Sequence, residues 1–104
     1  MNAKWVWNND SSHYFLNEKN SDEWKEFNKG RLILQYKFIK YDGENPIIFD
    51  NSKNMYGKIL DDQALFDYNK LENLTKAKYI EKGHWEVAPL NRPKNSPKEA
   101  EKSG

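Results

Sequence analysis

Aromatic side chains are the residues of this sequence with the greatest capacity to bind a ligand. The 104-residue chain contains 4 Trp, 6 Tyr and 5 Phe. Such rings bind sugars and bases by apolar contact and stacking, although they also fill cores. Trp5 and Trp7 share one face of a strand because side chains alternate with a period of two, so a sheet presenting both is the best binding surface. The candidate ligand-binding residues are Trp5, Trp7, Trp24, Tyr36 and Trp85.

Groups suited to catalysis are few. The only histidines are His13 and His84, and each adjoins an aromatic residue in a short predicted strand. A Ser–His–Asp arrangement could be drawn from Ser52, His84 and Asp50, but no Gly-x-Ser-x-Gly turn marks an activated serine. We therefore expect both histidines to be half-buried strand residues, and we assign no catalytic residue.

Glu26 is the acidic residue of most interest, because it shares a strand face with Trp24 and is buried if that face is interior. A buried carboxylate needs a partner that offsets its lost hydration. Arg31 or Lys37, across the following hairpin, is the expected partner. A structural ion pair at Glu26 is thus favoured over a catalytic acid.

No metal or cofactor is expected. The chain has no cysteine, which removes disulfides, thiol chemistry and the common zinc frameworks. Asp61, Asp62 and Asp67 offer oxygen ligands suited to calcium, but the D-x-[DN]-x-[DN]-G loop pattern is missing. A hairpin turn explains the Asp61-Asp62 pair.

Charge and hydropathy exclude several classes of partner. Lys and Arg number 17 against 16 Asp and Glu, a formal net charge of +1, so the concentrated basic face typical of duplex-DNA binders is not expected. The longest apolar runs are short, which predicts neither a membrane span nor a signal peptide. With no leader and no cysteine, the protein is expected to be soluble and cytoplasmic.

Turn-forming residues recur at the spacing of an antiparallel all-β domain. The strongest strand pattern covers residues 31–41, where Leu32, Leu34, Tyr36 and Phe38 alternate with polar or outward positions. We predict one antiparallel β domain over residues 1–87, either a small barrel or a curled sandwich of seven to nine short strands. Closure into a barrel is attractive because it removes sheet edges that invite aggregation.

The region between residues 69 and 82 is ambiguous. Leu71, Leu74 and a late cluster of lysines are compatible with a short helix, but we favour a loop leading into a strand at residues 77–80. Lys82-Gly83 is then a turn before a last strand at residues 84–87. Residues 88–104, rich in Pro, Lys and Glu, are expected to form a mobile tail.

Three short motifs resemble a functionally uncharacterised family of small all-β domains with the order W-x-E-[YF], D-x-S-[RK], G-x-W. They are Trp24-Lys25-Glu26-Phe27, Asp50-Asn51-Ser52-Lys53 and Gly83-His84-Trp85. The resemblance implies a fold but no activity, and Lys53 stands where the pattern usually has Arg, which weakens any anion-binding role. Trp5 and Trp24 also loosely resemble the ADP-ribose-binding WWE domain, but the helix and basic strand of that domain are missing.

The function expected from these residues is non-catalytic recognition of a small polar ligand or a saccharide by an aromatic face. The first alternative is a protein–protein interaction domain. The second is a small hydrolase-like enzyme using His84, Asp50 and Glu26. Ligand identity and oligomeric state are left open by the sequence.

Overall fold

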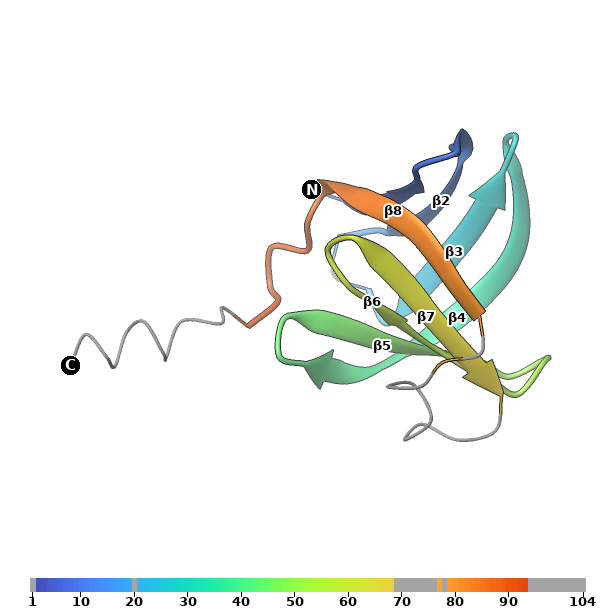
Figure 1. Cartoon of the computed structure of the whole chain (residues 1–104). Helices are drawn as coiled ribbons and strands as arrows, with labels where there is room; N and C mark the ends of the chain where they lie inside the picture. Colours follow the sequence, from blue (N-terminus) through green and yellow to red (C-terminus); the bar gives the residue numbers. More distant parts are fainter. Residues whose placement is uncertain (1, 20, 69–76, 78, 94–104) are drawn as a thin grey trace.

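The computed structural model describes residues 2–19, 21–68, 77 and 79–93, and these form an eight-stranded antiparallel barrel (Figure 1). Every strand pairs with its neighbours in sequence, and β8 pairs with β1 to close the barrel. The all-β prediction and its barrel alternative are confirmed. The strands are β1 (Ala3–Trp7), β2 (Asp10–Asn17), β3 (Glu23–Asn28), β4 (Arg31–Asp42), β5 (Asn45–Asp50), β6 (Met55–Ile59), β7 (Gln63–Tyr68) and β8 (Tyr79–Val87).

β8 differs from its prediction. The expected turn at Lys82-Gly83 is wrong, because β8 continues through both residues as one strand. Residues 79–82 are extended, so a helix does not reach them; the rest of the ambiguous region, apart from Ala77, lies outside the described residues. Gly83 instead marks a close approach inside the barrel, where the Trp5 indole packs directly against its backbone.

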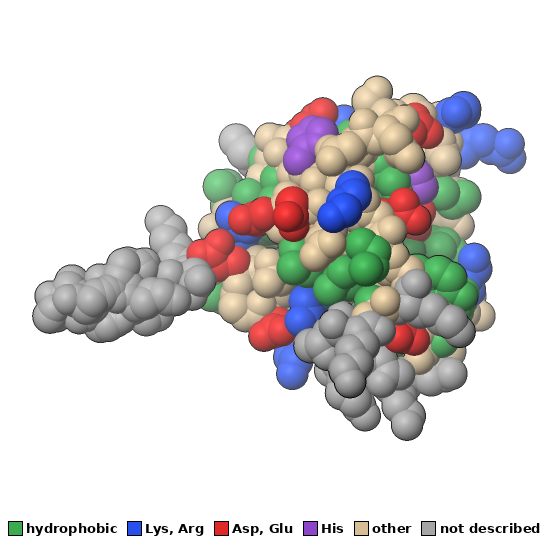
Figure 2. All heavy atoms as spheres, viewed as in Figure 1, with side chains coloured by type: hydrophobic (Ala, Val, Ile, Leu, Met, Phe, Trp, Pro, Cys, Tyr) green, Lys and Arg blue, Asp and Glu red, His purple; other side chains and the backbone are tan. Residues whose placement is uncertain are grey.

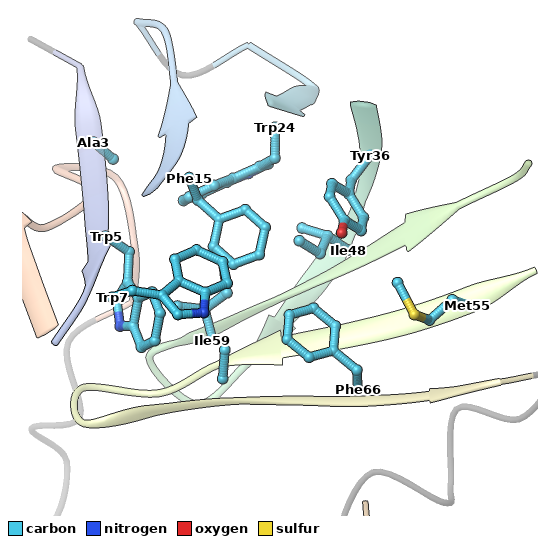
Figure 3. Close-up of a cluster of buried hydrophobic side chains, with 11 residues drawn as sticks. Ala3, Trp5, Trp7, Phe15, Trp24, Tyr36, Ile48, Met55, Ile59 and Phe66 are labelled. Atoms are coloured by element: carbon cyan, nitrogen blue, oxygen red, sulfur yellow. The ribbon is translucent and has the colours of Figure 1, made fainter. Parts of the chain in front are cut away.

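The barrel interior is packed with rings and aliphatic side chains at one end. Alternate residues of each strand face inward, as period-two alternation requires. The turns that follow β2, β4 and β6 lie at this end, which we call the closed end, and the turns after β1, β3 and β5 lie at the other, the open end. Figure 3 shows the cluster, in which rings from β1, β2 and β3 meet aliphatic side chains from β5 and β6. Its members toward the closed end are Trp5, Phe15, Trp24, Ile48 and Ile59.

The chain leaves β8 along the closed end. Pro89 is buried, and Arg92 lies 3.2 Å from Asp61 and 3.5 Å from Glu44 in ion pairs. Its guanidinium also lies 6.0 Å from the ring centre of Trp85. Pro89, Asn91 and Arg92 of the predicted tail therefore contact the barrel, and residues 94–104 lie outside the described part.

No helix in the described ranges is long and apolar enough to cross a membrane. On the face seen in Figure 2, acidic and basic side chains are spread among other residues and do not gather into one charged field. This distribution agrees with the nearly balanced charge of the sequence.

The contact between Trp5 and Gly83 joins the two strands that close the barrel, and it predicts a large cost for Gly83→Ala. A Cβ at Gly83 would lie 2.5 Å from Cζ3 of Trp5 and 2.5 Å from the carbonyl oxygen of Val6, which is backbone and cannot rotate away. We expect Gly83→Ala to lower the free energy of unfolding by about 3 kcal/mol or more, and the melting temperature by about 10 °C or more.

Gly57→Ala is the matched control, because Gly57 also faces inward from a strand. Its added Cβ would meet only side chains, the nearest being a Phe66 ring carbon at 3.0 Å. We expect a loss of about 1 kcal/mol there. Equal melting temperatures for the two variants would contradict the role assigned to the Trp5–Gly83 contact.

Candidate functional site

The five predicted ligand-binding residues converge, but inside the barrel. Trp5, Trp24, Tyr36 and Trp7 are 0%, 1%, 2% and 5% exposed, and Trp85 is half-buried. Trp5 and Trp7 do share a face, as the period of two predicts, but it is the inner face. The prediction that Trp5 and Trp7 form a binding surface on the sheet is therefore corrected. The chain has few branched aliphatic residues and uses its indoles to fill the barrel.

A hydrogen-bonded polar cluster lies above this packing, toward the open end. Glu26 on β3 is 8% exposed, and its Oε2 lies 2.6 Å from Nε2 of His13 on β2. The Tyr36 hydroxyl on β4 donates to Oε1 of Glu26 at 2.6 Å. Both carboxylate oxygens are thus engaged, which is the condition under which a buried carboxylate is tolerated.

The partners of Glu26 correct the sequence prediction. Arg31 and Lys37 are both exposed, at the start and in the middle of β4. Tyr36 occupies an even position, which faces inward, and His13 faces inward from β2 two residues before the buried Phe15. Strand parity excludes Lys37 as a partner of Glu26. Arg31 lies beyond a β-bulge at Ile33 and opposite Asn28, whereas Leu34 is the residue of β4 that lies opposite Glu26.

Electrostatics keeps the Tyr36 hydroxyl a hydrogen-bond donor. Burial raises the pKa of Tyr36 well above its usual value, and the nearby charge of Glu26 raises it further. The phenol therefore stays protonated across the physiological range and donates steadily to Glu26. In its ionised form the carboxylate only accepts hydrogen bonds, so Nε2 of His13 is then the second donor.

His13 is also fixed by an aromatic contact. Its ring stacks on the Trp7 indole with centroids 3.5 Å apart and planes within 3°. Nε1 of Trp7 donates to Oε1 of Glu81 on β8 at 3.2 Å. His13 and Glu26 are thus held by each other, by Trp7 on β1 and by Tyr36 on β4, and Trp7 is itself held by Glu81 on β8.

A pocket of about 320 Å³ opens above the cluster. This volume is at the lower end of the usual range for small-molecule sites, roughly 300–1,000 Å³. Trp7, Tyr36 and Phe66 contribute aromatic wall, while charged and phenolic groups also line it: Lys53, Tyr68, Tyr79 and Glu81. Tyr68 and Tyr79 are exposed and meet edge to face, with centroids 5.8 Å apart.

Of the five predicted residues, Trp7 and Tyr36 line this pocket, whereas Trp5, Trp24 and Trp85 do not. Sequence reasoning missed Tyr79, which falls at the edge of the ambiguous region. The sequence does place Tyr68 on one strand face with Ala64 and Phe66, although Tyr68 is not among the five candidates.

The alternative catalytic set is not brought together. His84 faces outward from β8, and its Nδ1 lies 2.7 Å from Oδ1 of Asn8. Asp50 is buried and accepts hydrogen bonds from the backbone N–H and the hydroxyl of Ser52, at 3.0 and 2.8 Å, as in an Asx turn. Glu26 faces the interior with different partners, so His84, Asp50 and Glu26 do not share a site.

The burial of the Tyr36 hydroxyl beside Glu26 predicts a specific alkaline instability. Because the folded state raises the pKa of Tyr36 while the unfolded chain titrates near 10, the folded state binds more protons above pH 10. The contribution of protonated Tyr36 to the free energy of unfolding is fully present below pH 10. Above pH 10 the free energy of unfolding falls by about 1.4 kcal/mol per pH unit.

Denaturant unfolding at several pH values between about 9 and 11 measures this slope. We expect Tyr36→Phe to remove the added slope and to cost about 1.5–3 kcal/mol at neutral pH, since the bond is to a charged group. Tyr14→Phe is the control, because Tyr14 faces outward and its ring stacks on Phe27. Identical pH slopes in wild type and Tyr36→Phe would disprove the assignment.

The motif resemblance can be compared with the positions of its residues. Glu26 and Lys53 line the open-end pocket, and Gly83 and Trp85 lie on β8. The family assignment itself stays a prediction. No protein-family model, no curated protein and no solved structure matches the chain.

Proposed function

We propose that this protein is a non-catalytic recognition module that binds a small polar molecule in the open-end pocket. The observation that carries the proposal is the unequal filling of the barrel. One end is packed by rings and aliphatic groups, whereas the other holds a pocket with a buried, hydrogen-bonded polar cluster at its base. Apolar walls with a few positioned polar groups are typical of small-molecule sites.

The groups around the pocket favour a ligand that carries both a flat or ring-shaped face and polar substituents. Tyr68 and Tyr79 offer exposed ring surface, and their hydroxyls and the Lys53 ammonium make no hydrogen bond within the described residues. The volume suits a molecule of about one sugar ring or one nucleobase. A saccharide or another small polar ring compound therefore fits the site.

The polar cluster supports binding rather than turnover. Both oxygens of Glu26 and the hydroxyl of Tyr36 are already hydrogen-bonded, and His13 is stacked on Trp7. In this arrangement the three residues set the shape and polarity of the pocket base. The cytoplasmic location inferred from the sequence remains part of the proposal.

Ligand titrations test the proposal directly. Monosaccharides, nucleosides and their neutral ring analogues are added singly, and binding is followed by tryptophan fluorescence and by amide chemical shifts. We expect one class to shift amides of β2, β7 and β8 near the open end and to leave the closed-end residues Asn17 and Asn45 unchanged. Shifts confined to the closed end would refute this site.

Tyr79→Ala tests whether the exposed tyrosines beside the pocket bind the ligand, and Ile80→Ala on the same strand is the control. Tyr79 lines the pocket, whereas Ile80, 52% exposed, does not and faces the outside. We expect Tyr79→Ala to weaken binding about tenfold or more, because stacking on an aromatic ring is worth about 1–3 kcal/mol. Ile80→Ala should change the affinity by less than about twofold.

A further inference from the structure

Asp50, the last residue of β5, carries a buried carboxylate of which only one oxygen is hydrogen-bonded. Its exposed fraction is 2%, and its Oδ1 accepts from both the backbone N–H and the hydroxyl of Ser52. Its Oδ2 is shielded from solvent and has no hydrogen-bond partner in the described part of the chain. None of the ion pairs among those residues includes Asp50. A buried carboxylate oxygen without a donor is costly, so it points to a donor from outside the chain.

Asp50 lines a groove of about 440 Å³ between the start of β4 and the turn after β5. Residues 50–52 form one wall of this groove, and residues 32–35 of β4 form the other. These described lining residues include no Lys or Arg, so Asp50 carries the only formal charge among them. The groove shares Leu34 with the open-end pocket, but its other lining residues do not line that pocket.

The strand across the groove from Asp50 is free to move on this side. Pairing of β4 with β5 begins at Lys37↔Phe49, and no earlier residue of β4 has a described partner on β5. A β-bulge at Ile33 also interrupts the pairing of β4 with β3. Residues 31–36 can therefore shift away from Asp50 without breaking a hydrogen bond to β5. A small group in the groove reaches Oδ2 by such a shift.

We propose that this groove binds a primary ammonium group on a short aliphatic chain, with Oδ2 of Asp50 as the acceptor. The two donors on Oδ1 leave a single free oxygen, which suits the point contact of an ammonium. A guanidinium fits less well, because its parallel N–H groups bind both oxygens of a carboxylate at once. The aliphatic chain lies against Leu32 and Ile33, which are 46% and 48% exposed. This site does not depend on the proposed ligand of the open-end pocket.

Titration of isotope-labelled wild-type protein with butylamine tests the site, and butanol at the same pH is the matched neutral ligand. We expect butylamine to shift the amides of Leu34, Gln35, Asn51 and Ser52 and to bind at least about tenfold more tightly than butanol, because the hydrogen bond is to a charged group. Tetramethylammonium has the charge but no N–H, so it should bind no more tightly than butanol. From methylamine to butylamine the affinity should rise about twofold or more per methylene, as apolar contact grows.

Asp50→Asn removes the acceptor and keeps the turn, since the amide Oδ1 still accepts from Ser52 while Nδ2 replaces the free oxygen. We expect it to weaken butylamine binding at least about tenfold. Asp10→Asn is the matched control. Asp10 forms the same turn with Ser12, at 3.0 Å to the backbone N–H and 2.6 Å to the hydroxyl, but it is half-buried and does not line the groove. Its affinity for butylamine should stay within about twofold of wild type.

The ammonium group can come from a free amine or from a lysine side chain, and a short blocked peptide with one central lysine distinguishes the two. Tighter binding of the peptide than of butylamine assigns the groove to lysine, and equal or weaker binding assigns it to a free amine. Equal wild-type affinities for butylamine and butanol would overturn the proposal, and this comparison needs no variant. Amide shifts spread over the exposed carboxylates, or equal butylamine binding by Asp50→Asn and Asp10→Asn, would overturn it as well.

Discussion

An eight-stranded barrel encloses an interior that side chains must fill, and the rest of this structure follows from how that volume is divided. Strand parity sends Trp5, Phe15, Trp24, Ile48 and Ile59 into it, and these residues are almost fully buried. Toward the open end the inward positions also carry polar groups, Glu26 and His13 among them. These groups hydrogen-bond to each other and to Tyr36, and a pocket lies beside them.

Glu26 connects the packing with the pocket. Its carboxylate is nearly buried, so loss of either donor would leave a charge with poor hydration. Both donors come from the strands beside β3: His13 from β2 and Tyr36 from β4. The pairing of β2, β3 and β4 therefore brings together the polar side chains that form the pocket base. A change in strand register would disturb both the pairing and these hydrogen bonds.

The sequence predicts the strands better than it predicts the site. Alternation over residues 31–41, with turn residues on both sides, is a local signal that requires only a period of two. The shared strand face of Glu26 and Trp24 follows from the same rule. Its partners do not, because which inward residues meet depends on how three strands align across the barrel. Gly83 shows the same limit: a glycine beside a lysine resembles a turn, and only the Trp5 indole on a distant strand explains it.

The order of strands around the barrel has a consequence for how the chain reaches this structure. Seven of the eight strand pairs join neighbours in sequence, so each can form as a local hairpin with little loop-closure entropy. Only the pairing of β1 with β8 brings the two ends of the barrel sequence together, and that pairing carries the Trp5–Gly83 contact. Closing this seam carries the greatest loop-closure entropy of the eight pairings, and the Trp5 indole packed against the Gly83 backbone stabilises it.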